Sequence, residues 1–455
     1  VRLARRSVFP LNMGKGMRTT ADVLSSAAAR THGVRSLTET QRMIPMNRCT
    51  NDVLHDELLG YVKDLVHCVL SRKSSRPLTQ LPMKPGTSQL VQDTVCGVRL
   101  PSSALHGLCT PATVGSRSMT GIEYLQFFLV ILPPLCYCRL FACDRVTTII
   151  LLLCVRLHIL GDPRKAAQFY LLLGDVVDAL NEMWVPTLGE ETLTLKNHSV
   201  LVHSHKNPIG PLFSASSSMF ESLNRIVKKG TIMSCHVSAI HKRAVLLSKM
   251  TDELTEIASD QASPMQHAAE TLLKEYCGRT DREEGGTRKM RGAVPSCKLD
   301  EWNHHCQYFI SQHDTGYELW PNAIVEGKKI HSYLLDYGRK SCNSIISYEN
   351  GVGVKWARVV LVGYKPGKVV VLAQSFKIGR VLSTLVGALE KDPLFSHVAN
   401  VLSECEDVHI LRRVLPVQNY PYVQLESKSI TGHGIKVCIE SREYIVASPF
   451  INTRT

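Results

Sequence analysis

The sequence lacks the short motifs by which several large enzyme classes are recognised. Its 455 residues contain no G-x-x-x-x-G-K-[ST] loop, no H-E-x-x-H, no G-x-S-x-G and no G-x-G-x-x-G. These patterns cradle phosphates, bind zinc or hold a serine on a sharp turn, so NTPase, zincin, hydrolase and Rossmann functions are without support. Internal repeats and long low-complexity tracts are missing as well, which favours a globular chain of roughly two to four domains.

Cysteine pairs with zinc-site spacing are also missing. The fifteen cysteines are scattered through the chain, and no C-x2-C pair occurs. In a chain of this length, scattered cysteines indicate reduced thiols rather than a disulfide framework. We expect Cys136, Cys138 and Cys143, which lie in the most apolar stretch, to be core thiols.

No apolar run is long enough to cross a bilayer, which takes about 20 residues. The most apolar stretch, 125–160, consists of one run of fourteen residues interrupted by Pro133-Pro134 and a second run of ten. Charged residues separate the two runs, and Arg156 ends the second. We therefore expect buried core helices and no membrane partner; a membrane hairpin at 125–160 is the alternative.

Acidic residues are scarce near the start of the chain. The first fifty residues hold nine Lys or Arg but only Asp22 and Glu39, within a total net charge of +13. This excess favours a polyanionic partner, either nucleic acid or anionic lipid. An Arg- and Ser-rich, acid-poor start is also typical of a mitochondrial transit peptide. Because the chain opens on Val, it also fits a fragment whose start lies upstream.

The pattern of apolar residues predicts four regions. Residues 1–115 are irregular apart from one helix near 51–71, 116–275 are helical, 276–304 form a charged, Gly-rich linker, and 305–455 form a small β-rich domain. Within the helical region, Asp162-Pro163 predicts the start of a helix through 184, and Lys228-Lys229-Gly230 predicts the end of another. Period-two, β-branched runs predict strands over 354–364, 368–378, 422–430 and 435–448.

The order of several motifs carries a family resemblance. NDVLHDELLGYVKDL (51–65) is followed by MTGIEYLQFFLVILPP (119–134) and IILLLCVRLHIL (149–160), then by a segment with GPLF and MFESLNR (210–225) and a β-rich tail. This order resembles the C-terminal portion of CACTA-type (En/Spm-like) DDE transposases. The resemblance implies an α+β multidomain fold: a remnant of an RNase H-like core, a helical insertion domain and the β-rich C-terminal domain.

The resemblance also implies candidate catalytic residues. Glu221 matches the position of the third acid of a D-D-E triad, whose carboxylates hold Mg²⁺ ions for strand cleavage and transfer. Asp52 and His55 match the family's C/D-x-x-H motif, with Asp56 beside them. Ordinary helix roles remain open, because Asp52 suits an N-cap and Glu221 suits a first turn.

The first two aspartates expected in this family have no counterpart, because Asp22 is the sole Asp that precedes Asp52. A two-metal site needs several carboxylates to position its ions. We therefore expect a transposase-derived protein that is not a competent nuclease as given and that binds DNA without sequence specificity. A non-catalytic nuclear DNA- or protein-binding module is the alternative. The resemblance implies a nuclear location, and the N-terminus a mitochondrial one.

Other constellations are weaker. His198, His203 and His205 have spacings that suit neither a helical nor a hairpin zinc site, so polar contacts between helices are favoured. Cys297 followed by His304-His305-Cys306 offers four potential zinc ligands. Adjacent histidines rarely bind one ion together, and we do not expect zinc there.

Overall fold

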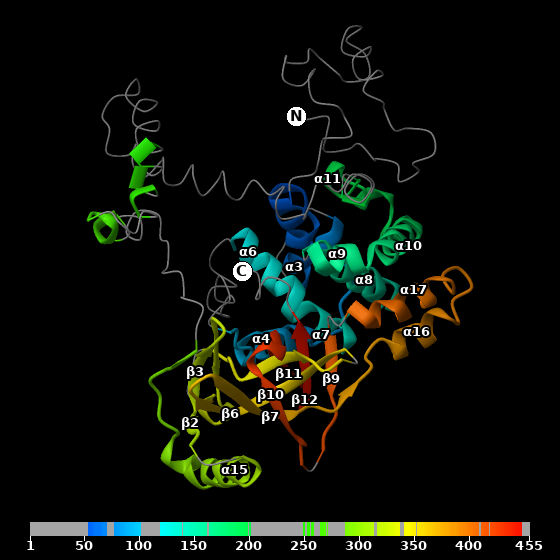
Figure 1. Ribbon diagram of the computed structural model, residues 1–455. Coiled ribbons are helices and arrows are strands. Elements are labelled where there is room, and N and C mark those ends of the chain that lie inside the picture. Colours follow the sequence, from blue (N-terminus) through cyan, green and yellow to red (C-terminus); the bar gives the residue numbers. More distant parts are fainter. Residues whose placement is uncertain are drawn as a thin grey trace. The chain divides into compact units, whose positions relative to one another are not determined.

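The computed structural model describes most of two stretches of the chain, one on each side of a region where only short helical pieces are described. The first comprises residues 53–70, 77–101, 119–138, 140–161, 163–198 and 200–201. The second comprises 287–313, 316–336, 341–351, 353–408, 411–417 and 419–447, and the short pieces lie between 249 and 271. The chain divides into two compact units, residues 1–215 with 286–455, and residues 216–285. The first unit contains both stretches and is the subject below (Figure 1).

The helix predicted near 51–71 is confirmed. It consists of a π-helix, η3 (Val53–Val62), that continues into α3 (Lys63–Val69). Gly60 has non-helical backbone angles and marks a kink. A short η4 (Pro77–Gln80) and α4 (Thr87–Gly97) follow, so the described residues between 53 and 101 are mainly helical.

The apolar stretch 125–160 forms core helices, as predicted. Thr120 and Glu123 form a reciprocal capping box at the start of the first helix, where each side chain satisfies a backbone amide of the other residue. Every residue from 127 to 136 and from 146 to 161 is buried. The elements are α6 (Gly121–Gln126), η5 (Phe127–Ile131), α7 (Leu132–Tyr137) and α8 (Asp144–Gly161).

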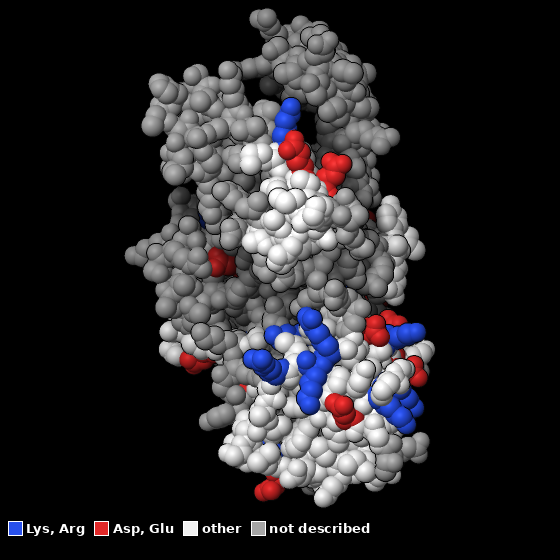
Figure 2. Space-filling model, turned by 60° about the vertical axis from the view of Figure 1, so that its left-hand side comes forward, with Lys and Arg blue, Asp and Glu red and all other residues white. Residues whose placement is uncertain are grey.

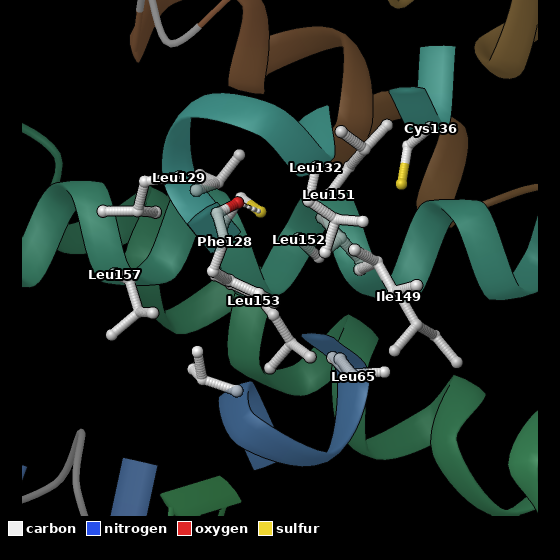
Figure 3. Packing of buried hydrophobic residues seen from close by; sticks show 14 of the residues in the cluster. Leu65, Phe128, Leu129, Leu132, Cys136, Ile149, Leu151, Leu152, Leu153 and Leu157 are labelled. Atoms are coloured by element: carbon white, nitrogen blue, oxygen red, sulfur yellow. Dashed lines mark hydrogen bonds between the residues drawn. The ribbon is translucent and has the colours of Figure 1, made fainter. Parts of the chain in front are cut away.

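Close packing between these helices fills the core of the helical part. Figure 3 shows leucines of α8 lying against Phe128, Leu129 and Leu132 of the preceding helices, with Leu65 of α3 reaching the same cluster. The thiol of Cys154 donates a hydrogen bond to the Phe128 carbonyl at 3.6 Å. In the described residues, none of the helices has both the length and the apolar character that a bilayer crossing requires.

The helix predicted over 162–184 is present but broken near its start. It consists of α9 (Pro163–Gln168) and α10 (Tyr170–Leu188), and η6 (Glu190–Thr192) and α11 (Leu195–His198) follow. The sequence predicts an apolar stripe of Phe169, Leu172, Val176, Val177 and Leu180 along this helix; the last four are buried, and Phe169, at the start of α10, is partly buried. The helix end predicted at 228–230 lies outside the described residues.

Every strand pair among the described residues is antiparallel. A three-stranded sheet has the order β1-β3-β4, and a nine-stranded sheet has the order β10-β7-β6-β5-β11-β12-β9-β8, with β2 also pairing with β6. The first half of β11 pairs with β5 and its second half with β12, so one strand continues the sheet around a curl. The strands are β1 (Arg288–Lys289), β2 (Glu318–Trp320), β3 (Asn322–Val325), β4 (Lys328–His331), β5 (Ile345–Glu349), β6 (Val354–Lys365), β7 (Lys368–Ser375), β8 (Ile378–Gly379), β9 (Leu411–Val414), β10 (Tyr422–Glu426), β11 (Ile430–Ile439) and β12 (Arg442–Ala447).

Each of the four predicted strand regions contains a strand, but two of them differ in detail. In the region 422–430 the strand ends at Glu426, and η12 (Ser427–Ser429) is a 3₁₀ turn. The run 435–448 contains a hairpin, because Glu440 and Ser441 adopt positive φ between β11 and β12. The helix α15 (Leu299–Gln312), preceded by η9 (Ser296–Lys298), begins inside the segment 276–304 that the sequence suggested as a linker. The α+β class is confirmed. The RNase H-like remnant is not seen among the described residues and stays a hypothesis.

The helical part and part of the β-rich region share one hydrophobic core. Its members include residues of α8 and α10 together with residues of β11, β12, α16 (Ser383–Leu389) and α17 (Val398–Glu404). Tyr137 packs edge-on against Tyr444 at 5.6 Å, and α7 lies next to β11 (Figure 1). Arg145 reaches Asp392 with two hydrogen bonds of 2.6 and 3.0 Å. The domain boundaries predicted from sequence stay a prediction.

Candidate functional site

The residues predicted from the family resemblance are mostly outside the described part of the chain. Asp52, Glu221 and the side chain of Asp56 all lie outside it. His55 is exposed in η3, and its carbonyl accepts a hydrogen bond from Lys196 Nζ at 2.7 Å. The Mg²⁺ site therefore stays a prediction. In the described ranges, no three His, Cys, Asp or Glu side chains converge as metal ligands.

The histidines that suggested zinc ligation have other surroundings where they are described. His305 of α15 is buried and Cys306 is partly buried, whereas His304 and Cys297, the latter in η9, are exposed. These four described side chains do not form a metal-ligand group. His203, His205 and the side chain of His198 lie outside the described residues. His305 itself belongs to a different arrangement, which sequence spacing did not indicate.

That arrangement begins with the packing of α15 on the nine-stranded sheet. Asp300 and Glu301 stand in the first turn of α15, where their charge complements the helix dipole. Phe309, which lies later in the same helix, is fully buried against residues of β6 and β7. A Cβ atom on Gly363 of β6 would lie 2.4 Å from the Phe309 ring. Only glycine at 363 therefore lets the helix approach the sheet this closely.

Strand register places three polar side chains beside this helix. Arg358 of β6 pairs with Gln374 of β7, and Gln374 pairs with Tyr422 of β10. Residues opposite one another in neighbouring strands project from the same face, so the three side chains form one row across the sheet. Arg358 Nε donates to Gln374 Oε1 at 2.8 Å within this row.

A chain of hydrogen bonds connects the row to α15. The Tyr333 hydroxyl donates to Glu301 Oε1 at 2.5 Å, and His305 Nε2 lies 3.0 Å from the same hydroxyl. Because that hydroxyl already donates its one hydrogen to Glu301, it can only accept from His305, and His305 Nε2 is therefore the donor. His305 Nδ1 then accepts from the Tyr422 hydroxyl at 2.6 Å, which makes the imidazole neutral.

The pKa shifts agree with this assignment. Burial lowers the pKa of His305 and outweighs the opposing influence of Glu301. Burial raises the pKa of Tyr333, and its bond to Glu301 raises it further. Burial would raise the pKa of Glu301, but its hydrogen bonds from Tyr333 and Lys298 hold that pKa below its usual value. The group therefore has a neutral histidine between two neutral tyrosines and one carboxylate paired with Lys298 at 2.9 Å.

Arg358 packs against two aromatic rings. Its guanidinium lies 4.1 Å from the centroid of Tyr333 and 4.9 Å from that of Tyr420. Among the residues that the structure describes, its one hydrogen bond is the Nε bond to Gln374, so its two terminal nitrogens have no protein acceptor. We call Arg358, Gln374, Tyr333, Tyr420 and Tyr422 the arginine–tyrosine site.

The chemistry of this site is that of an anion receptor next to aromatic surface. A guanidinium held by stacking and by its Nε loses little entropy when its fork binds an anion, and that fork matches phosphate oxygens in pairs. The sequence offered one signal for it, an Arg within the apolar strand run 354–364. Nothing in the spacing joined that Arg to Tyr333, which precedes the run, or to tyrosines near a later strand.

A second charged feature was also missed. Glu57 and Arg156, whose side chains are both fully buried, form an ion pair with contacts of 2.8 and 3.1 Å. The Tyr61 hydroxyl donates to Glu57 at 3.3 Å. This triad lies in the core between η3 and α8, so its role is structural.

Comparisons with protein-family models, curated proteins and solved structures find no match to this chain.

Proposed function

We propose that this chain is a transposon-derived DNA-binding protein, related to the C-terminal part of CACTA-type DDE transposases, that does not cleave DNA by itself. The order of motifs between 51 and 225 supports the relationship. Under this proposal, residues 1–115 are a remnant of an RNase H-like core and the protein acts in the nucleus. The observation that carries the DNA-binding proposal is a set of cations on the three-stranded sheet.

These cations gather on β1, β4 and the residues next to them. Register aligns Arg288 with Ile324 and Ile324 with Lys329, so Arg288 and Lys329 share one row and one face. The cations of this set, which are Arg288, Lys289, Arg291, Lys328 and Lys329, form no ion pair within the described part of the chain. Figure 2 shows Lys and Arg side chains gathered in the lower half of the view, which is the half where Figure 1 draws the strands. We call this set the basic sheet patch; it consists of Arg288, Lys289, Arg291, Lys328 and Lys329.

Unpaired cations in a cluster favour a polyanion, because phosphate contacts release condensed counterions from DNA. With a net charge of +13, the protein should bind duplex DNA of any sequence. Base specificity is not part of the proposal, since phosphate contacts carry no direct sequence information.

The test measures binding of the full chain to a mixed-sequence duplex over a series of salt concentrations. We expect the slope of log K against log salt to become less steep by about 1 for each phosphate-contacting cation removed. The variant Arg288→Gln/Lys289→Gln/Arg291→Gln should therefore lose up to about 3 from the slope. Lys391→Gln, an exposed cation after α16, is the matched control. Absence of duplex binding by the wild-type chain at low salt would remove the proposal.

Strand cleavage is the second expected outcome. Under the proposal, the chain should not nick a transposon-end duplex in Mg²⁺ or Mn²⁺, because Glu221 with Asp52 supplies too few carboxylates to position two ions. The assay is relaxation of a supercoiled plasmid that carries the transposon-end sequence, with the wild-type chain and Glu221→Gln compared. Nicking that disappears in Glu221→Gln would contradict the expectation and assign the active site to Glu221.

A further inference from the structure

We infer that the arginine–tyrosine site binds single-stranded DNA, with Arg358 holding a phosphate and Tyr420 contacting the adjacent unpaired base. The inference rests on the proposed DNA-binding function and adds the form of DNA that this site takes. It uses residues of the nine-stranded sheet, whereas the proposed duplex contacts lie on the basic sheet patch.

The first step of the argument is that the guanidinium is already in place for a ligand. The rings of Tyr333 and Tyr420 both lie within 5 Å of its Cζ, at 4.1 and 4.9 Å, and its Nε donates to Gln374. The terminal nitrogens, which have no acceptor among the described residues, are therefore the part left for an anion. Arg358 is only partly exposed, so a phosphate bound there is less screened by water than one on an open surface.

The second step concerns the aromatic surface next to the fork. Tyr420 is partly exposed, and Phe376 contacts its ring edge-on at 5.4 Å. Its hydroxyl makes no hydrogen bond within the described part of the chain. Tyr308, also partly exposed, stacks on Tyr422 at 4.1 Å and extends the aromatic surface. A cation with several tyrosines along a sheet edge is the combination that binds a single strand.

The third step separates single-stranded from double-stranded DNA. Bases in a duplex are stacked on one another and cannot lie on a protein ring without being extruded, which costs free energy. An unpaired base can use the ring at once, because every base has an aromatic face. The nearby carboxylate of Glu301 does not oppose this, since Lys298 and the Tyr333 hydroxyl both donate to it. The site therefore favours the unpaired strand.

The experiment uses the full chain and fluorescence anisotropy with a labelled oligothymidylate of about 12 nucleotides, a length within the range that such sites cover. Tyr420→Ala should weaken binding of this single strand by roughly 5- to 150-fold, the range found when one stacked ring is removed. Tyr420→Phe, which keeps the ring, should bind like the wild type. Affinity for a duplex of the same length should not change in either variant.

Charge is tested on the same strand. Arg358→Gln and Lys355→Gln each remove one cation from β6, but only Arg358 belongs to the site. We expect Arg358→Gln to weaken the single-strand complex by a similar factor, and Lys355→Gln to leave it within about twofold. If Arg358→Gln weakens duplex binding by the same factor as single-strand binding, Arg358 is a general phosphate contact and the inference is wrong.

Two further outcomes separate this inference from the proposed function. Unchanged single-strand affinity in Tyr420→Ala and Arg358→Gln would overturn the inference and leave duplex binding intact. Failure of the wild-type chain to bind either single-stranded or duplex DNA would overturn both the inference and the proposed function.

Photo-crosslinking of the wild-type protein to bromouracil-containing DNA avoids any dependence on variant folding. Crosslinks at Tyr420 or Tyr333 support the inference, and crosslinks confined to other parts of the chain contradict it.

Discussion

Replacing Glu57 by Gln should destabilise the protein by about 3–5 kcal/mol, the largest effect that we expect from a single substitution. The substitution leaves Arg156 charged in a core where both side chains of the pair are fully buried. A buried charge without its counter-ion carries the full cost of leaving water. Tyr61, whose hydroxyl donates to Glu57 at 3.3 Å, cannot compensate, because a neutral hydroxyl carries no counter-charge for Arg156.

Urea unfolding followed by tryptophan fluorescence measures this loss, because Trp184 is buried in the same core. The double variant Glu57→Leu/Arg156→Met removes both charges and should recover most of the stability. Glu443→Gln is the matched control: its partner Lys436 is 3.1 Å away, but the two side chains are 38% and 41% exposed. Exposed pairs contribute about 0–1 kcal/mol. Equal urea midpoints for Glu57→Gln and Glu443→Gln would contradict the prediction, because they would show that water reaches the core pair and screens the Arg156 charge.

The same ion pair shows where sequence analysis of the core reached its limit. The sequence predicts Arg156 only as the charge that ends an apolar run. Its neutralisation inside α8 depends on Glu57, ninety-nine residues earlier in the chain. Periodicity describes one helix at a time, so it predicted that 125–160 is buried but not which charge would enter the core with it.

Strands were easier to predict than the site that they build. Alternating β-branched residues located β6, β7, β10 and the β11–β12 region, because a half-buried pleated strand imposes that pattern locally. The arginine–tyrosine site, in contrast, depends on register across three strands and on α15 packing over Gly363. Those are long-range relations. The sequence indicates His305 only as a potential zinc ligand, because its hydrogen-bond partners, Tyr333 and Tyr422, lie 28 and 117 residues away.

Acidification from about pH 6.5 towards pH 4 should lower the stability of the protein, chiefly through two buried histidines. Burial lowers the pKa of His433 from 6.5 to about 4, helped by the charge of Lys328 and by His331, although the bond to the Lys329 carbonyl opposes the shift. Burial also lowers the pKa of His158 well below its usual value, and Lys165 adds to this. Neither ring nitrogen of His158 has a hydrogen-bond partner among the described residues.

The sign follows from proton uptake. Between these folded-state pKa values and the unfolded value of 6.5, the unfolded chain binds more protons, so the free energy of unfolding falls as the pH falls. For His433 alone, the loss at pH 4 is about 3 kcal/mol. Lost carboxylate pairs also destabilise proteins in acid, but they titrate nearer pH 4, which leaves the window above pH 5 to the histidines.

The variants His433→Gln and His158→Leu separate these contributions. Each should flatten the dependence of unfolding free energy on pH between 6.5 and 5, and the double variant should flatten it most. His158→Leu should also raise stability at pH 7 by about 1–3 kcal/mol, because it removes a buried ring whose nitrogens lack partners. His304→Gln on the exposed side of α15 is the control. If the double variant loses stability as steeply as the wild type over this range, other groups cause the acid sensitivity, and the buried histidines do not.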